Sequence, residues 1–220
     1  MRSREEIKGF LKDIQRKDVG MVERAKLFAE FAHAGQLDKG GQAYIYHPTR
    51  VGDMTAEKYG DDYLTAAAYM HDVVEDGGFT VSDLAAYFPE AVWKTVELLT
   101  RGKSEAREVY IDNIAKNLLA TKVKLMDLRD NMNLSRLTYV TEKDSLRQSR
   151  YVDEFRKLNS QMMELVVSWC PVPKAICGLM RISYSVFGVS LWKVLWMQQR
   201  SPITIDRKST RLNSSHQVLS

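Results

Sequence analysis

Four ionisable residues interrupt an apolar part of the chain, in the stretch AAAYMHDVVEDGGFT, where His71-Asp72 is followed by Glu75-Asp76. Such groups are costly to place near a core unless something pairs with them, and a metal ion is a natural partner. In a helix, each member of the second pair lies one turn after its counterpart in the first, so the two share a face. The pattern predicts a fold in which the first pair holds a metal, the second lies over its open side, and other segments supply the missing ligands.

Almost the whole chain as far as residue 168 shows the apolar spacing of α-helices. The segment MVERAKLFAEFAHAG repeats apolar residues at intervals of three and four and stops at Gly35, and TKVKLMDLRDNMNLSRL is expected to be helical as well. Because no run alternates convincingly with a period of two residues, the sequence predicts an all-α fold, a single helical bundle. Helix starts are expected at Pro48, at Asp61 or Asp62, at Thr80 with Asp83, at Pro89 and at Ser104.

The composition limits the class of protein. The 220 residues are 45% hydrophobic, which is enough for one sizeable core and predicts one main domain. The net charge of +4 is modest, and no basic stripe with interleaved aromatic residues indicates nucleic-acid binding. The N-terminal segment lacks the apolar core of a signal peptide, so we expect a cytoplasmic protein without a membrane partner. Cys170 and Cys177 alone form neither a zinc site nor a disulfide framework.

The character of the sequence changes from Val166 onward, where acidic residues and a clear amphipathic period are lost. Residues 169–205 are therefore left open, and a frameshifted or run-off segment is one interpretation. Their apolar run 182–192 is too short to span a bilayer, but its basic flanks make a membrane-surface helix an alternative. Residues 206–216, DRKSTRLNSSH, resemble a translated sequencing-library adapter, so we interpret 206–220 as an artefact rather than as an ordinary polar tail.

Two residues elsewhere in the chain could complete a metal site. His47 lies in YIYHPTRV at a predicted helix start, and Asp127 lies among apolar residues in VKLMDLRDNM. Two imidazoles and two carboxylates, with water, form a mixed site that suits Mn2+, Fe2+ or Zn2+ better than a thiolate-rich structural zinc. Open water positions would make the centre catalytic, because a metal lowers the pKa of its water toward neutrality. Each residue also has an ordinary alternative: Asp127 could pair with Lys124 or Arg129, and His47 could bond to backbone.

The motifs together resemble a known family. Residues 23–137 are similar to the HD-domain metal-dependent phosphohydrolases, specifically to the RelA/SpoT-type hydrolase domain that degrades the alarmones ppGpp and pppGpp. The resemblance covers roughly half of the chain, with its motifs in family order. It implies that residues 1–168 are an HD-type hydrolase domain with a metal site in its core. The matching segments are HAGQ at 33–36, Lys39, YIYHP at 44–48, HDVVED at 71–76 and KLMDLRDNM at 124–132.

The resemblance implies roles for individual residues. Glu75 and Asp76 match the acidic pair that positions or activates the attacking water. Lys39 matches a basic residue of the substrate loop, and Asn131 matches a position near the substrate ribose. Lys124 is a further candidate to offset phosphate charge, while His33 is expected to orient the loop rather than to bind metal. The implied metal ligands, usually for Mn2+, are His47, His71, Asp72 and Asp127.

Four positions depart from the family pattern. Asp38 stands where the family usually has Arg, and an Asp there would repel nearby phosphates. Asn133 and Leu134 stand where Arg and Thr are frequent, and Gly77 replaces a frequent Thr. These positions concern recognition of the base rather than the metal, so the resemblance leaves guanine specificity open.

The implied function is hydrolysis of the 3′-pyrophosphate of ppGpp and pppGpp, small nucleotides, by a metal-activated water. The chain looks like a hydrolase-only form, and the sequence leaves its oligomeric state open. One alternative is an HD-superfamily phosphohydrolase that acts on another nucleotide, which Asp38 and Asn133 favour. A second is a non-catalytic nucleotide-binding module, against which the complete acidic pair argues. A third is a fragment that cannot fold stably.

Overall fold

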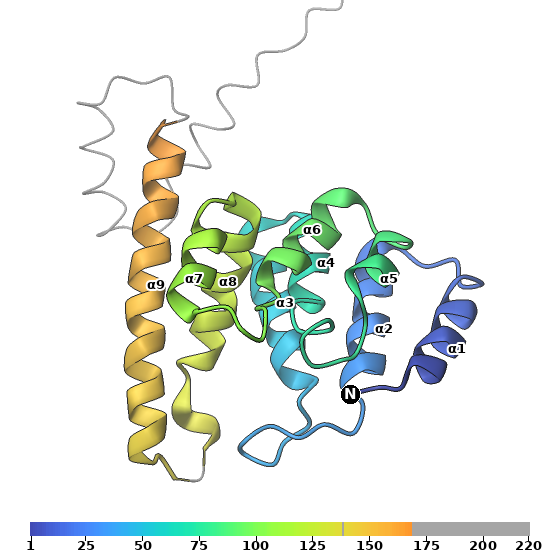
Figure 1. Cartoon of the computed structure of the whole chain (residues 1–220), viewed down its shortest axis with the longest axis horizontal. Coiled ribbons are helices and arrows are strands. Elements are labelled where there is room, and N and C mark those ends of the chain that lie inside the picture. Colours follow the sequence, from blue (N-terminus) through green and yellow to red (C-terminus); the bar gives the residue numbers. More distant parts are fainter. Residues whose placement is uncertain (138, 169–220) are drawn as a thin grey trace, which may run out of the picture. The chain divides into compact units, whose positions relative to one another are not determined.

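The computed structural model describes residues 1–137 and 139–168, which fold mostly into helices (Figure 1). In this part of the chain, extended pairing is confined to one isolated antiparallel bridge between Leu37 and Ala43. The predicted all-α fold is confirmed. The helices are α1 Arg4–Ile14, α2 Met21–His33, α3 Tyr46–Tyr59, α4 Asp62–Tyr69, α5 Val81–Ala85, α6 Glu90–Leu99, α7 Arg107–Ala115, α8 Leu118–Asn131 and α9 Glu142–Ser168, with a 3-10 helix, η1, at Leu134–Arg136.

Several helices begin and end where the sequence predicts. Asp61 accepts a hydrogen bond from the N–H of Leu64 at the start of α4, and Thr80 with Asp83 forms the capping box of α5. α2 ends just before Gly35, whose φ of 80° lies in the left-handed region. These predictions are confirmed. Each could be made from the sequence because a cap depends on residues that are neighbours in the chain. Pro48 in the first turn of α3 and Pro89 just before α6 also lie at the predicted starts.

Two helix boundaries differ from the prediction. α7 begins at Arg107 rather than behind a Ser104 cap, because the N–H of Glu105 donates to the Gly102 carbonyl and closes a separate turn there. α8 ends earlier than predicted, and the side chain of Asn133 then caps η1.

The segment that carries the His-Asp pair is not the helix that the sequence predicted. α4 ends at Tyr69, and the residues that follow form successive turns. Nδ1 of His71 donates to the Ala68 carbonyl at 2.8 Å, a carbonyl that a continuing helix would use for the N–H of Asp72. One bond of helical spacing remains, from the N–H of Asp76 to the Asp72 carbonyl at 2.9 Å. The acidic pair therefore depends on tertiary contacts, and not on a helix, for its position.

The centre of the described fold lies where α3, α4 and α8 pack against one another. Small residues permit this close approach: the alanines at 66–68 are buried, and a Cβ on Gly52 would lie 2.5 Å from the Tyr69 ring. α2 and α6 pack against α4, and α9 packs against α7 and α8. In Figure 1, α1 and α9 lie at opposite ends of this array. The predicted metal ligands belong to the central elements or to the turns that follow α4.

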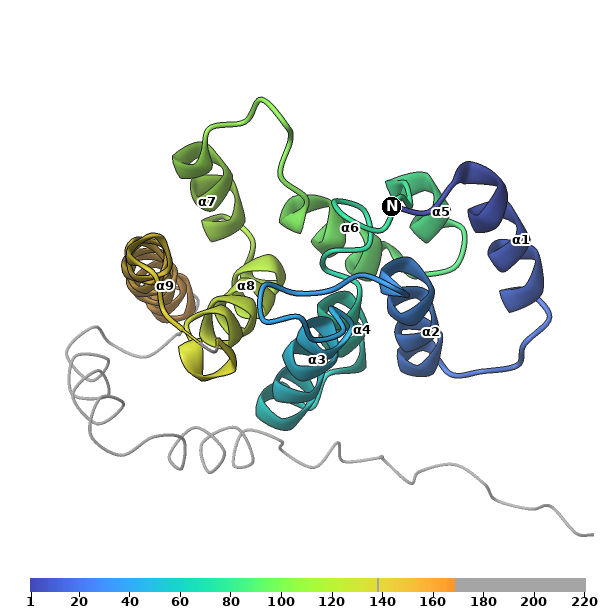
Figure 2. The ribbon, with the colours of Figure 1, turned by 90° about the horizontal axis from the view of Figure 1, so that it is seen from below.

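The loop between α2 and α3 is shaped by its own backbone hydrogen bonds. The N–H of Tyr44 donates to the Gln36 carbonyl at 2.9 Å, and that of Asp38 donates to the Gln42 carbonyl at 2.7 Å. The loop extends toward the segment that follows α8 before it turns back into α3 (Figures 1 and 2). This path brings residues 37–44 beside the end of α8.

Some interpretations from the sequence lie outside the described residues. They are the frameshifted or run-off segment at 169–205, the alternative surface helix at 182–192 and the adapter artefact at 206–220, together with both cysteines. None of the helices in the described part combines the length and the apolar run that crossing a bilayer would require.

An ion pair joins the first helix to α5. The Arg4 guanidinium donates to both oxygens of Asp83, at 2.5 and 2.7 Å, and the Asp83 residue is buried. The hydrogen bond from Arg4 is the largest influence that lowers the pKa of Asp83, to about 2. Because this pKa lies below its usual value of 3.8, the stabilisation is present above about pH 4 and is lost as the pH falls through about 2.

We expect Asp83→Ala to lower the free energy of unfolding by about 1–3 kcal/mol near neutral pH, since it removes both the ion pair and the α5 capping box. Urea denaturation near pH 7 and near pH 2 measures this loss. The loss should shrink at the lower pH, where the wild-type carboxylate becomes protonated. An equal loss at both values would contradict the linkage.

Candidate metal centre and adjoining pocket

The four predicted ligands converge from three parts of the fold: α3 supplies His47, the turns after α4 supply His71 and Asp72, and α8 supplies Asp127. Nε2 of His47 lies 3.2 Å from Nε2 of His71 and 3.2 Å from Oδ1 of Asp127. These three residues are buried, and their donor atoms lie within 4.8 Å of one another. Asp72 stands outside that mutually close group, but its Oδ2 lies 3.0 Å from Nε2 of His71 and 3.7 Å from Nε2 of His47.

Hydrogen bonds fix which ring nitrogen of each histidine faces the cluster. Nδ1 of His71 contacts the Ala68 carbonyl, which only accepts, so this nitrogen carries the hydrogen. Nδ1 of His47 lies 2.7 Å from Oδ2 of Asp130, a carboxylate that also accepts from Arg50 at 2.7 and 3.0 Å. In neutral rings both Nε2 lone pairs would therefore face each other and the carboxylates. Such an arrangement repels itself without a cation, and its nitrogen and oxygen donors fit a divalent metal.

The electrostatics of the cluster agree with this fit. Burial lowers the pKa of His47, but its hydrogen bonds to Asp127 and Asp130 and the charges of the carboxylates outweigh that effect and raise it to about 9. The pKa of His71 is also raised: burial lowers it, but the charge and hydrogen bond of Asp72 and the charge of Asp127 together outweigh that effect. Burial alone would raise the pKa of Asp127, but Lys124 and the histidines hold it well below its usual range. The cluster thus attracts positive charge, and a metal must displace protons in order to bind.

Other side chains orient the two carboxylates. Nζ of Lys124 lies 2.7 Å from Oδ2 of Asp127, and Nδ2 of Asn131 donates to Oδ1 of the same residue at 2.5 Å. The hydroxyl of Tyr44 donates to Oδ2 of Asp72 at 2.6 Å. Lys124 therefore pairs with the carboxylate of Asp127, which is the pairing that the sequence offered as the ordinary alternative for this residue. Asp127 therefore pairs with Lys124 and belongs to the His/Asp cluster at the same time.

The acidic pair borders this cluster. Glu75 and Asp76 are both exposed residues. Partial burial raises the pKa of both carboxyls, and the charge of Asp72 adds to the effect. Oε2 of Glu75 accepts from the backbone N–H of Arg101 at 3.2 Å. Carboxyls with raised pKa beside a cation site are suited to accepting a proton.

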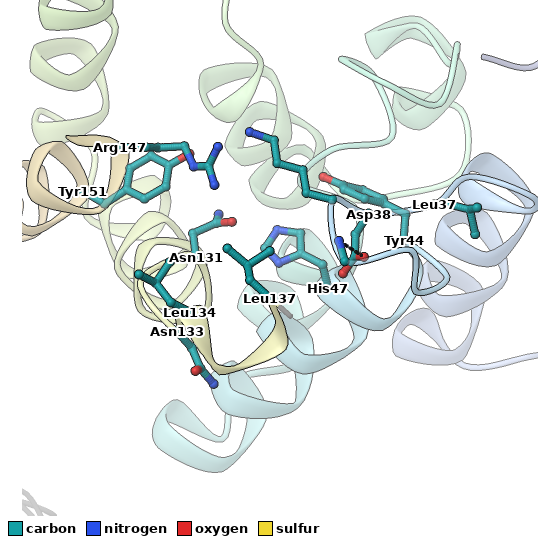
Figure 3. Close-up of a pocket in the computed structure, with 12 residues that line it drawn as sticks. Leu37, Asp38, Tyr44, His47, Asn131, Asn133, Leu134, Leu137, Arg147 and Tyr151 are labelled. Atoms are coloured by element: carbon teal, nitrogen blue, oxygen red, sulfur yellow. Dashed lines mark hydrogen bonds between the residues drawn. The ribbon is translucent and has the colours of Figure 1, made fainter. Parts of the chain in front are cut away.

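A cavity of about 240 Å3 adjoins the cluster and shares His47 with it (Figure 3). Lys39 and Asn131, both predicted from the sequence, line this cavity. Arg147 and Tyr151 of α9 lie across it from Asp38 and Tyr44 in Figure 3, and sequence reasoning missed both of them. The helical spacing of α9 predicts a buried face but gives no signal of which cavity that face meets. The remaining lining residues are Leu37, Gly40, Asn133, Leu134 and Leu137.

Asp38 has a structural task in the loop. Its Oδ1 accepts from the N–H groups of Gly40 and Gln42, at 2.8 and 2.9 Å, so the carboxylate closes the turn that carries Lys39. His33, expected to orient the loop, is buried, and its Nδ1 lies 3.0 Å from Oε1 of Gln36. It lies outside the close group of donor atoms.

Known proteins resemble about half of this chain. A probable guanosine-3′,5′-bis(diphosphate) 3′-pyrophosphohydrolase of Synechocystis is 33% identical over 123 residues, which are 51% of this chain and 16% of that protein. The Aquifex aeolicus guanosine-3′,5′-bis(diphosphate) 3′-pyrophosphohydrolase is 35% identical over 117 residues, 51% of this chain and 17% of that protein. The chain therefore spans about a sixth of the length of these two relatives.

A solved structure is also similar to this chain. It is described as a metazoan orthologue of SpoT that hydrolyses ppGpp, and it shares 25% identity with this chain at a TM-score of 0.55. The match covers 66% of this chain and 87% of that one. The HD-domain family itself matches residues 25–164, well over half of the chain. The chain therefore belongs to the HD-domain family, and this domain implies a divalent metal centre.

Proposed function

We propose that this chain hydrolyses the 3′-pyrophosphate of ppGpp and pppGpp and that residues 1–168 form the hydrolase domain. The observation that carries the proposal is the junction of three features: a buried His/Asp cluster, an acidic pair at its border and a cavity that carries Lys39 and Arg147. The relatives named for this reaction and the structure described as hydrolysing ppGpp support the choice of substrate.

We assign His47, His71, Asp72 and Asp127 as the ligands of the metal, with Mn2+ as the ion and Fe2+ or Zn2+ as the alternatives. The bound ion supplies Lewis acidity, which offsets charge on the phosphoryl oxygens and makes a water more acidic. Lys124, Asn131 and Tyr44 hold the ligand carboxylates in place through the contacts described above.

Glu75 or Asp76 then accepts the proton that the attacking water loses. The water oxygen bonds to the phosphorus attached to the nucleoside 3′ oxygen. The bond between that phosphorus and the 3′ oxygen breaks with its electron pair on the oxygen, which takes up the proton from the carboxyl, so that pyrophosphate and a 3′ hydroxyl remain. The raised pKa of both carboxyls favours proton acceptance at neutral pH. The position of Glu75 is fixed by its hydrogen bond to the N–H of Arg101.

The cavity divides into groups suited to different parts of a nucleotide. Lys39 and Arg147 offer positive charge to phosphates, while Asn131 and Asn133 offer amides to the ribose or the base. Tyr151 and the leucines offer apolar surface to a base.

Hydrolysis of another nucleotide remains the second candidate, because Asp38 and Asn133, which depart from the family pattern, both line this cavity. The cytoplasmic location stays a prediction.

We expect the purified chain with Mn2+ to release pyrophosphate from ppGpp, and Asp72→Asn to reduce the rate by about 100-fold or more. GTP, ATP and NADPH form the comparison panel, and pyrophosphate or phosphate release is the measurement. Release from another member of the panel alone would favour the second candidate. Metal binding without any release would favour a non-catalytic binding module.

The carboxylate behind His47 should control metal affinity. We expect Asp130→Ala to weaken Mn2+ binding by about 10- to 100-fold, because Nδ1 of His47 and the Arg50 guanidinium lose their acceptor. Isothermal titration of the metal-free protein measures this affinity. Asp53→Ala, which removes an exposed carboxylate from α3, the helix that carries His47, is the control and should leave the affinity unchanged. Equal affinities for Asp130→Ala and wild type would contradict the assignment of His47 as a ligand.

Arg147 should contribute to substrate binding rather than to chemistry. We expect Arg147→Ala to raise the KM for ppGpp by about tenfold with little change in kcat, because a cation is lost on the cavity wall. Nη2 of Arg147 donates to Oδ1 of Asp144 at 2.6 Å. This hydrogen bond orients the guanidinium and uses only one of its five N–H donors. Arg156→Ala, on an exposed part of the same helix, is the control. A fall in kcat at constant KM would argue against this role.

A further inference from the structure

We propose that Gln36 and Arg2 are positioning residues that clamp the turn Asp76–Gly78 from two sides and thereby hold the acidic pair against the metal cluster. The proposal rests on the proposed function only for its kinetic readout. It arises because the acidic pair does not belong to a helix. Both of its members are exposed residues in a run of turns, so the contacts that hold the neighbouring backbone help to set their positions, in addition to the hydrogen bond from the Arg101 N–H to Glu75.

The first arm of the clamp is the side chain of Gln36. Its Nε2 donates to the backbone carbonyl of Asp76 at 3.0 Å and also contacts the Ala32 carbonyl at 3.4 Å. Because both partners only accept, Oε1 is the atom that faces Nδ1 of His33, at 3.0 Å. The backbone of Gln36 is itself bonded to His33 and Tyr44. The amide therefore links Asp76 rigidly to the end of α2 and to the loop that leads into α3.

The second arm is the N-terminal segment. The N–H of Arg2 donates to the carbonyl of Gly77 at 3.2 Å. The Arg2 guanidinium ties this segment to the end of α2 through Nε to the Phe31 carbonyl at 2.9 Å and Nη2 to the Ala34 carbonyl at 3.1 Å. It also lies 5.1 Å from the centre of the Phe31 ring. Removing the guanidinium would thus release the backbone that holds Gly77.

The two glycines show how tightly the clamp closes. A Cβ on Gly77 would lie 2.5 Å from the Val73 carbonyl oxygen and 2.6 Å from Cβ of Ala32. A Cβ on Gly78, whose φ is 89°, would lie 2.8 Å from the carbonyl oxygen of Arg2. The turn is therefore pressed between α2 and the N-terminal segment, with no room for a side chain on either glycine. This close packing explains why residue 77 is a glycine, where the family frequently has Thr.

The test compares Gln36→Leu and Arg2→Ala with two matched controls in the full chain. Gln42→Leu makes the same substitution at an exposed position of the same loop, and Arg4→Ala removes the ion pair between α1 and α5. We expect each clamp variant to lower kcat for ppGpp by about 10- to 100-fold, with the KM and the Mn2+ affinity within about twofold of wild type. Arg4→Ala should lower the melting temperature and leave kcat unchanged.

A double-mutant cycle separates positioning from general damage. If the clamp acts through the acidic pair, either clamp variant should change kcat by less than about twofold in an Asp76→Ala background. If kcat of the double variant fell by the product of the losses in the clamp variant and in Asp76→Ala, the proposal would be overturned. An unchanged kcat in the single clamp variants would also overturn it. Exchange of the backbone amides of residues 76–79, measured without substrate, should be about tenfold faster in both clamp variants than in both controls. This last readout decides the proposal even if the chain does not hydrolyse ppGpp, and equal exchange rates would refute it.

Discussion

The burial of opposite charges between α3 and α8 is the constraint on which the rest of the structure depends. Asp127 lies beneath the surface with His47, and removing one partner of such a pair is costly because it leaves a buried charge without compensation. A continuous chain of contacts prevents this: Arg50 holds Asp130, Asp130 holds His47, and His47 faces Asp127. The chain crosses repeatedly between the two helices and therefore fixes their relative register, which apolar packing alone leaves adjustable.

The same polar contacts explain which parts of the fold could be predicted from the sequence. The all-α class and the caps at Asp61 and Thr80 were predictable, because apolar spacing and capping act between near neighbours. The end of α4 was not. His71 leaves the helical path because its ring must present Nε2 to His47, and its Nδ1 then takes the Ala68 carbonyl. A contact with a distant helix thus overrides the local preference, and a single sequence shows only that preference.

The site residues also separate into those that the sequence could predict and those that it could not. The residues that gather in the His/Asp cluster were predictable, because a motif states both the residue types and their order. The position of Lys124 could only be offered as alternatives, since one lysine can face either a ligand or a phosphate. Arg147 and Tyr151 were missed because they reach the cavity through the packing of α9 on α8 and α7, which the Arg107–Glu154 ion pair supports at 2.5 and 2.8 Å. Periodicity predicts a helix face, but not the partner of that face.

The structure also changes what the departure at Asp38 means. From the sequence, a carboxylate in the substrate loop predicts repulsion of phosphates. In the fold, Oδ1 of Asp38 is occupied by the N–H groups of Gly40 and Gln42, and the turn that it closes carries Lys39 to the cavity wall. Much of the effect of Asp38 is therefore structural. If the cavity binds a nucleotide, as proposed, the groups left to distinguish one base from another are the neutral ones in its lining, which would select by shape and by amide hydrogen bonds rather than by charge.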